Sequence, residues 1–180
     1  MSASGIFLSR SRYWLTKEYP IKLRLCVNAL PRDAVWARPN ETSNSIGNLL
    51  VHITGNVTEW ILGGVGGRSV KRYRAGEFEQ KDGADGAALL DNLEKVLQEA
   101  DAVLAGLTEE DLKRSIVIQA RDTNVLGAIY HVVEHFAMHT GQIVLMTKIY
   151  APGKIQFYED DGGLARPTWH RGTTLDEAAH

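Results

Sequence analysis

The sequence contains a single cysteine, Cys26, so no disulfide can form within the chain. A single thiolate also excludes a cysteine-rich zinc cluster, and any metal site must therefore use histidine or carboxylate ligands. Cys26 lies among apolar residues at helical spacing. We interpret it as a buried, unreactive thiol rather than a catalytic one.

Long apolar runs and an excess of basic charge are also missing. No apolar run approaches the roughly 20 residues of a membrane-spanning helix, and residues 1–12 lack the pattern of a secretory signal. The chain has 20 Lys and Arg against 22 Asp and Glu, and the basic residues are scattered. We therefore expect a cytoplasmic protein that binds neither a membrane nor nucleic acid.

What the sequence does contain is helical periodicity over four stretches. With 180 residues, 44% of them hydrophobic, the chain is long enough for one domain with a substantial core. The stretches predict an all-α protein, a four-helix bundle. We expect the first helix to kink at Pro20, the second to be capped by Ser43 or Ser45, and the fourth by Asp122 or Thr123. The predicted helices cover approximately residues 4–30, 46–62, 85–107 and 123–150.

The connections between these helices differ in character. The polar segment from Arg68 to Gly83 is long for a compact bundle and suggests a crossover or a lid, with a solvated loop as an equal alternative. Residues 114–120 alternate β-branched side chains and predict one short β-strand between the third and fourth helices. We expect the bundle to span residues 1–158 and residues 159–180 to form a loosely attached tail.

Three histidines fall in one run of the fourth helix: His131, His135 and His139. Residues four apart on a helix are separated by about 6 Å along the axis and about 40° around it, so two such imidazoles can bind one ion. His131 and His139 are about 12 Å apart by the same geometry, too far to share it. The run therefore offers two chelating pairs, and His135 belongs to both. His170 and His180 lie in the expected tail, where we assign them no role in the site.

The third ligand should come from another helix, and His52 in the second helix is the remaining helical histidine. Alone it could equally be a core histidine bonded to a carbonyl. Several histidines facing a bundle interior favour a metal, because unpaired polar groups in a core are costly. His52 lies about 9 Å from the start of its helix. If the fourth helix is antiparallel to the second, His139 is nearer that level than His131, which favours His52, His135 and His139.

The segments GNLLVHITGN (residues 47–56) and HVVEHFAMHTGQ (residues 131–142) resemble the DinB superfamily of metalloenzymes. The loop with Trp36, the start of the second helix and the order of the helices agree with it, over approximately residues 5–150. The resemblance implies an up-down-down-up bundle with a crossover, a homodimer, and a metal held by His52, His135 and His139 with waters. Some relatives are transferases or isomerases that use low-molecular-weight thiols, and many have no known activity. Thr140 departs from the family's usual Arg or His before Gly-Gln.

Three imidazoles leave a divalent ion an open position, as in catalytic sites, whereas structural zinc usually has four protein ligands. Such an ion lowers the pKa of a bound water or thiol. Imidazole suits several transition metals. We expect zinc or nickel, with iron or manganese as alternatives.

Neighbouring side chains that could support such an ion are His131, Asn56, Gln142 and Glu134. Gln142 is the strongest of these candidates, because it follows the last histidine of the run by three residues. Glu134 and Glu59 could orient ligands or act as a general base, although a solvated helix face is the better explanation for each. The sequence identifies no catalytic residue.

Three hypotheses follow for the function. The first is a metal-dependent enzyme with a small-molecule substrate, such as a thiol-dependent S-transferase or a hydrolase. The second, the alternative to the first, is a non-catalytic, metal-binding or stress-associated protein, and the third is a bundle with ordinary core histidines.

The expected homodimer is motivated further by apolar and aromatic residues on the first helix: Phe7, Tyr13 and Trp14.

Overall fold

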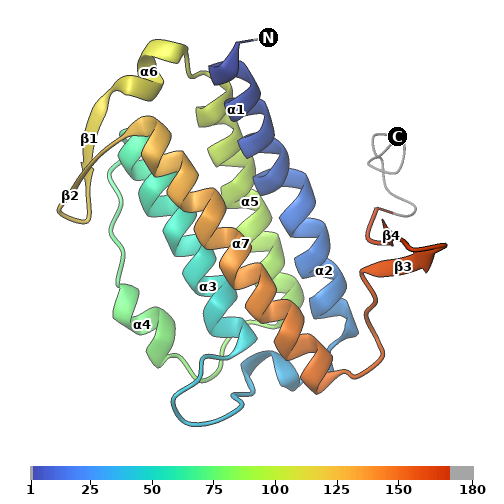
Figure 1. Ribbon diagram of the computed structural model, residues 1–180. Coiled ribbons are helices and arrows are strands. Elements are labelled where there is room, and N and C mark those ends of the chain that lie inside the picture. Colours follow the sequence, from blue (N-terminus) through green and yellow to red (C-terminus); the bar gives the residue numbers. More distant parts are fainter. Residues whose placement is uncertain (1, 171–180) are drawn as a thin grey trace.

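Four long helical segments lie side by side in the computed structural model, which describes residues 2–170 (Figure 1). Their elements, in chain order, are α1 (Ala3–Tyr13), η1 (Trp14–Glu18) and α2 (Tyr19–Ala29); α3 (Ile46–Val57) and η3 (Thr58–Val65); α5 (Gly86–Ala105); and α7 (Val125–Tyr150). Both η1 and η3 are π-helical continuations of the α-helices beside them. The predicted all-α, four-helix fold is therefore confirmed.

The four segments have the up-down-down-up topology, in which the first and last segments run in one direction and the middle two run in the opposite direction. In Figure 1, α1–α2 and α7 descend while α3 and α5 ascend, so that α3 and α5 are parallel and α3 and α7 are antiparallel. Because two parallel helices follow each other in the chain, residues 66–85 must cross the length of the bundle between them. This crossover carries the short helix α4 (Arg74–Glu79), which packs on α3.

The first segment is continuous in helical conformation through the predicted kink at Pro20. The π-helical turn η1 ends immediately before α2, and Pro20 is the second residue of α2. Proline has no backbone N–H and its ring crowds the preceding turn, so a helical segment that continues through Pro20 loses a backbone hydrogen bond there. The interruption thus takes the form of a widened helical turn.

Side chains cap the starts of α3, α5 and α7. Ser45 accepts from the backbone N–H of Asn48 at 3.0 Å, and the Asn48 side chain accepts from the N–H of Ser45 at 3.0 Å. Asp85 caps α5 in a similar way. For α7 the cap is Asn124, not the predicted Asp122 or Thr123, because the preceding strand extends through Asn124.

The core fills the space between the four segments. Phe136 of α7 and Leu23 of α2 are buried in it, and Cys26 is also fully buried, as predicted. Close to this core, the ring of Trp36 in η2 (Ala34–Trp36) covers Gly47, where a Cβ would lie 2.7 Å from the ring. Within the described residues, no helix has both the length and the apolar character that crossing a membrane requires.

A short helix and a β-hairpin connect α5 to α7. After α6 (Glu109–Lys113), strand β1 (Ser115–Ile118) pairs antiparallel with β2 (Arg121–Asn124), with Ser115 opposite Asn124. The sequence predicted one strand here, and the structure has two. The second strand reads Arg-Asp-Thr-Asn and has no apolar alternation by which to recognise it.

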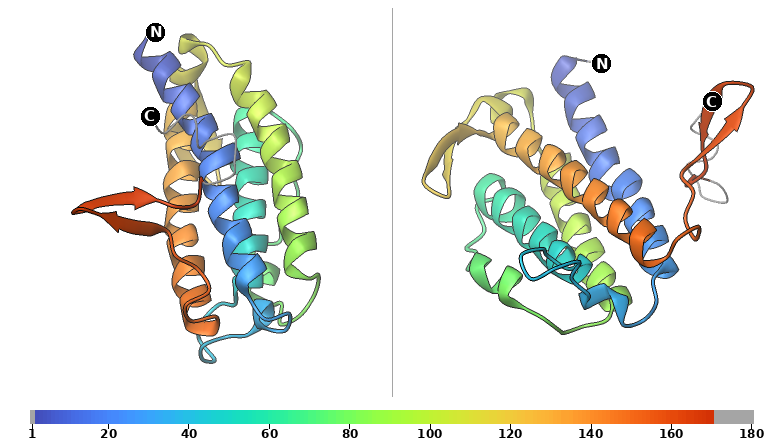
Figure 2. Two further views of the ribbon diagram at one scale, coloured as in Figure 1. Left: turned by 90° about the vertical axis from the view of Figure 1, so that its right-hand side faces the viewer. Right: turned by 60° about the horizontal axis from the view of Figure 1, so that its bottom comes forward.

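A second hairpin follows α7 and extends away from the bundle (Figure 2). It pairs β3 (Tyr158–Asp161) with β4 (Leu164–Pro167), and Trp169 and His170 after it are buried. Residues 159–170, which were expected in a loose tail, therefore take part in secondary structure and buried contacts. Residues 171–180, which include His180, lie outside the described residues.

Candidate metal centre

The structure brings together three of the six histidines: His52 from α3, and His135 and His139 from α7. One ring nitrogen of each lies within 4.8 Å of the others. Nε2 of His135 lies 3.0 Å from Nε2 of His52 and 3.1 Å from Nε2 of His139. The two histidines on α7 are one helical turn apart, and the antiparallel packing of α3 places His52 at their level.

His131 lies beside this group and not within it. Its ring stacks on Trp60 with centroids 4.0 Å apart and an interplanar angle of 36°. Its Nε2 is 3.4 Å from the side-chain nitrogen of Asn56. The structure thus places His131 as the neighbour that the family resemblance implied, and of the two possible pairs on α7 it brings His135 and His139 to His52.

The outer nitrogens of two of the histidines are held by oxygen acceptors. Nδ1 of His52 lies 2.8 Å from Oε2 of Glu77, and Nδ1 of His139 lies 2.6 Å from Oε1 of Gln142. An ionised carboxylate and an amide oxygen only accept, so both imidazoles carry their proton on Nδ1. Their Nε2 lone pairs therefore point toward His135. Gln142 occupies the supporting position that its spacing predicted.

Burial keeps the imidazoles of His135 and His139 neutral. Desolvation lowers the pKa of His135 to about 3, with further lowering by His139, His52, His131 and Arg72. Desolvation also lowers the pKa of His139. Neutral imidazole is the form that binds a metal, and at about pH 7 both groups are in that form.

The three converging Nε2 atoms have too few protons to form a hydrogen bond at every contact, which favours a bound cation. With its proton on Nε2, His135 can donate to His52 or to His139, and the other short contact then has no hydrogen bond; with its proton on Nδ1, the Nε2 lone pair of His135 faces the lone pairs of both neighbours. A divalent ion bound to all three nitrogens replaces this repulsion with attraction. The donor set is therefore compatible with a divalent transition metal, while its identity does not follow from imidazole ligands alone.

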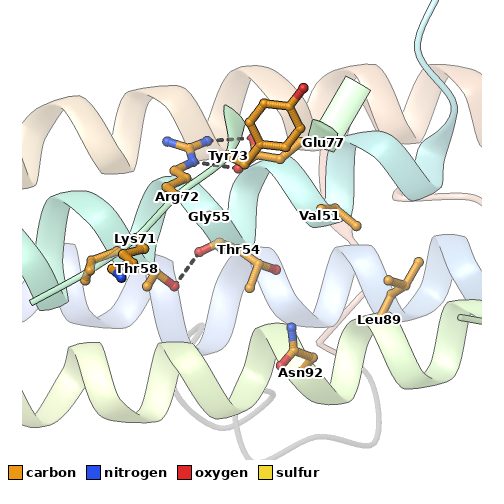
Figure 3. A pocket seen from close by; sticks show the side chains of 11 residues that line it. Val51, Thr54, Gly55, Thr58, Lys71, Arg72, Tyr73, Glu77, Leu89 and Asn92 are labelled. Atoms are coloured by element: carbon orange, nitrogen blue, oxygen red, sulfur yellow. Dashed lines mark hydrogen bonds and ion pairs between the residues drawn. The ribbon is translucent and has the colours of Figure 1, made fainter. Parts of the chain in front are cut away.

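A buried ion-pair network supports His52 from the crossover. Arg72 donates through Nε to Oε1 of Glu77 at 2.6 Å and through Nη2 to Oε2 at 2.8 Å (Figure 3). It also donates through Nη1 to Glu59 at 2.8 Å, and Glu59 accepts from Gln119 of the β1–β2 turn at 2.6 Å. Burial raises the pKa of Glu77, but His52 and Arg72 outweigh it and hold that pKa below its ordinary value.

Arg72 and Glu77 are the residues beside the three histidines that the sequence did not reveal. They line a pocket of about 310 Å³ between the crossover, α3 and α5. The polar segment that carries them was read as a crossover, a lid or a solvated loop, and its only unusual signal was its cluster of arginines.

The remaining candidate residues divide into buried and exposed positions. Glu134 is exposed on α7, which fits the solvated helix face that was the alternative for it. Asn56 is buried, and its Oδ1 has no hydrogen-bond partner among the described residues. The same holds for Nε1 of Trp60, one turn further along the helix. Glu59 contacts the arginine network and not the histidines.

Comparisons with known proteins agree with the fold. Residues 7–157 match the model of a family described as "Protein of unknown function (DUF1572)". Among solved structures, the chain is similar to the 2.30 Å crystal structure of a DinB-like protein, YjoA, from Bacillus subtilis, with 20% identity and a TM-score of 0.62, covering 84% of this chain and 98% of that one. No curated protein matches. The DinB-like fold expected from the sequence is confirmed.

Proposed function

We propose that this protein, which belongs to the DUF1572 family, is a metal-dependent enzyme that binds one divalent transition-metal ion through His52, His135 and His139. The observation that carries the proposal is the convergence of three Nε2 atoms, two of them with their proton fixed on the opposite nitrogen. Lone pairs that converge in a protein interior repel each other, and a cation bound between them removes that repulsion.

The chemistry would be activation of a small nucleophile. When bound, the ion would supply a Lewis acid that lowers the pKa of a water or thiol toward neutrality. Three protein ligands leave room for such a molecule. His52 and His139 are buried while His135 is only partly buried, so a substrate would approach from the side of His135.

Asn56 and Trp60 are the residues that we assign to substrate orientation. They pack around His131, whose ring centroid lies 5.4 Å from that of His135. Asn56 Oδ1 can accept a hydrogen bond and Trp60 Nε1 can donate one, and both are buried without a partner among the described residues. A buried polar atom without a partner costs about 1–3 kcal/mol, so a ligand that carries both a donor and an acceptor gains by binding here.

The substrate class that we propose is a low-molecular-weight thiol with such polar groups. The test is to load the protein with Co²⁺ and to titrate it with small thiols while recording the visible absorption spectrum. We expect a thiolate-to-cobalt charge-transfer band that is absent in His135→Ala. A spectrum that no thiol changes would contradict thiol binding at the ion and would favour the alternative, a metal-binding protein without this catalysis.

A further inference from the structure

We infer that Glu77 and Arg72, on the crossover between α3 and α5, are positioning residues that decide which nitrogen of His52 carries the proton. The inference rests on the proposed metal site and concerns its affinity for the ion. Glu77 selects the tautomer that can bind a metal, Arg72 holds Glu77 in place, and Gly55 provides the space for both.

The contact between Glu77 and His52 is buried on both sides. The two side chains are 8% and 4% exposed, and Oε2 lies 2.8 Å from Nδ1. An ionised carboxylate can only accept here, so the proton is on Nδ1 and Nε2 is available as a ligand. Metal-binding histidines in proteins commonly donate their second N–H to a carboxylate in this way, which fixes the ring and raises its basicity.

Arg72 and Glu77 compete for the same nitrogen of His52, Nδ1. Nη2 of Arg72 lies 3.1 Å from Nδ1 of His52, close enough to donate to it. If Arg72 donated there, the imidazole would carry its proton on Nε2, the nitrogen that faces the other histidines. Glu77 prevents this, because its two oxygens accept from Nε and Nη2 of Arg72 and its Oε2 also accepts from His52.

Gly55 allows the pair to reach His52. A Cβ at position 55 would lie 2.3 Å from Oε1 of Glu77 and 2.8 Å from Nε of Arg72. Figure 3 shows this glycine on α3, beside the two charged side chains. Alanine at this position must therefore move the pair, although it changes no charge.

The experiment measures the dissociation constant of zinc by competition with a chromophoric chelator. We expect Glu77→Ala to bind zinc about 10–100-fold more weakly than the wild type, the range for loss of such supporting contacts. The double variant Arg72→Met/Glu77→Ala should bind more tightly than Glu77→Ala, because the competing donor is gone. Glu79→Ala, on the same helix but exposed, is the matched control and should bind as the wild type does.

A spectroscopic measurement separates positioning from a general structural role. Nitrogen-15 spectra of the histidine rings in metal-free protein should show the Nδ1–H tautomer for His52 in the wild type and the Nε2–H tautomer in Glu77→Ala. Gly55→Ala should weaken zinc binding with its charges intact. Glu77→Gln keeps the shape of the side chain, so it tests the role of the charge if the alanine variant does not fold.

The outcomes distinguish this inference from the proposed function. Equal zinc affinity in the wild type and Glu77→Ala, or no recovery in the double variant, would overturn the inference and leave the metal site standing. A wild type that binds no metal would overturn the proposed function, while the ring spectra would still show whether Glu77 sets the tautomer of His52.

Discussion

The imidazole of His131 stacks on the indole of Trp60, with their ring centroids 4.0 Å apart, one helical turn away from His135. This contact, together with the 3.4 Å approach of Asn56, holds His131 beside the three converging histidines. On α7, His135 therefore lies between His131, a neighbour of the site, and His139, a second converging histidine.

Replacing His131 should therefore leave the metal in place. We predict that His131→Gln retains one equivalent of bound metal, whereas His139→Gln loses most of it, because only the second removes a converging Nε2. Metal content after gel filtration measures both. Loss of metal from His131→Gln at unchanged helicity would show that the chelating pair on α7 is His131 and His135.

The positions of the three histidines could be predicted because each depends on a regular geometry. Helical spacing pairs His135 with His131 or His139, and the antiparallel packing of α3 against α7 brings His52 to the level of His135 and His139. The spacing follows from the periodicity of a helix, whereas the antiparallel arrangement was a condition of the prediction, which the structure meets. The same reasoning located Gln142, one turn after His139.

The support of His52 by Glu77 could not be predicted in this way. The two residues are 25 positions apart, and Glu77 lies in a polar crossover without periodicity. Its approach depends on Gly55 and on a buried ion pair with Arg72, which are tertiary contacts. The C-terminal hairpin was missed for a similar reason, since what holds the chain after it is a distant group, Glu18.

Glu18 joins the first helical segment to the residues after the second hairpin. This buried carboxylate accepts from Nε1 of Trp169 at 2.8 Å and lies 2.8 Å from Nε2 of His170 and 2.9 Å from Nζ of Lys22. Burial raises its pKa, but Lys22 and His170 outweigh this and hold the pKa below its ordinary value. We predict that Glu18→Gln lowers the free energy of unfolding by about 1–3 kcal/mol at neutral pH.

The pH dependence of that difference follows from the sign of the shift. A carboxylate with a lowered pKa in the folded state stabilises the protein above its unfolded pKa, and this stabilisation is lost as the pH falls through the folded value. Urea unfolding should therefore show the difference between the wild type and Glu18→Gln shrinking under acid conditions. Glu110→Gln, at an exposed site, is the control. A difference that grows on acidification would contradict the role of Glu18.

Cys26 should be chemically silent in the folded protein. Burial raises the pKa of its thiol to about 11, against smaller opposite effects of Thr147 and Lys148. The thiolate is the reactive form, so we predict no reaction with Ellman's reagent under native conditions and full reaction in denaturing urea. Rapid native labelling would contradict this, and would also require Cys26 to be considered as a source of the thiol in the proposed chemistry.

The homodimer expected from the sequence stays a prediction, with a different surface. Phe7 and Trp14 pack against the core, whereas α7 exposes five large apolar side chains: Leu126, Tyr130, Met138, Leu145 and Ile149. We predict that sedimentation equilibrium gives twice the chain mass of 19.9 kDa and that Leu145→Glu shifts the protein to the monomer. A wild type that sediments as the monomer at micromolar concentration would exclude the dimer.

The most direct test of the metal site is elemental mass spectrometry of protein purified without a histidine tag, beside the His135→Ala variant. His135 contributes the nitrogen that contacts both other ligands, so its loss removes the centre of the group. We predict one equivalent of a divalent transition metal in the wild type and none in the variant. Absence of metal from both proteins, even after incubation with zinc, nickel and manganese, would contradict the proposed site.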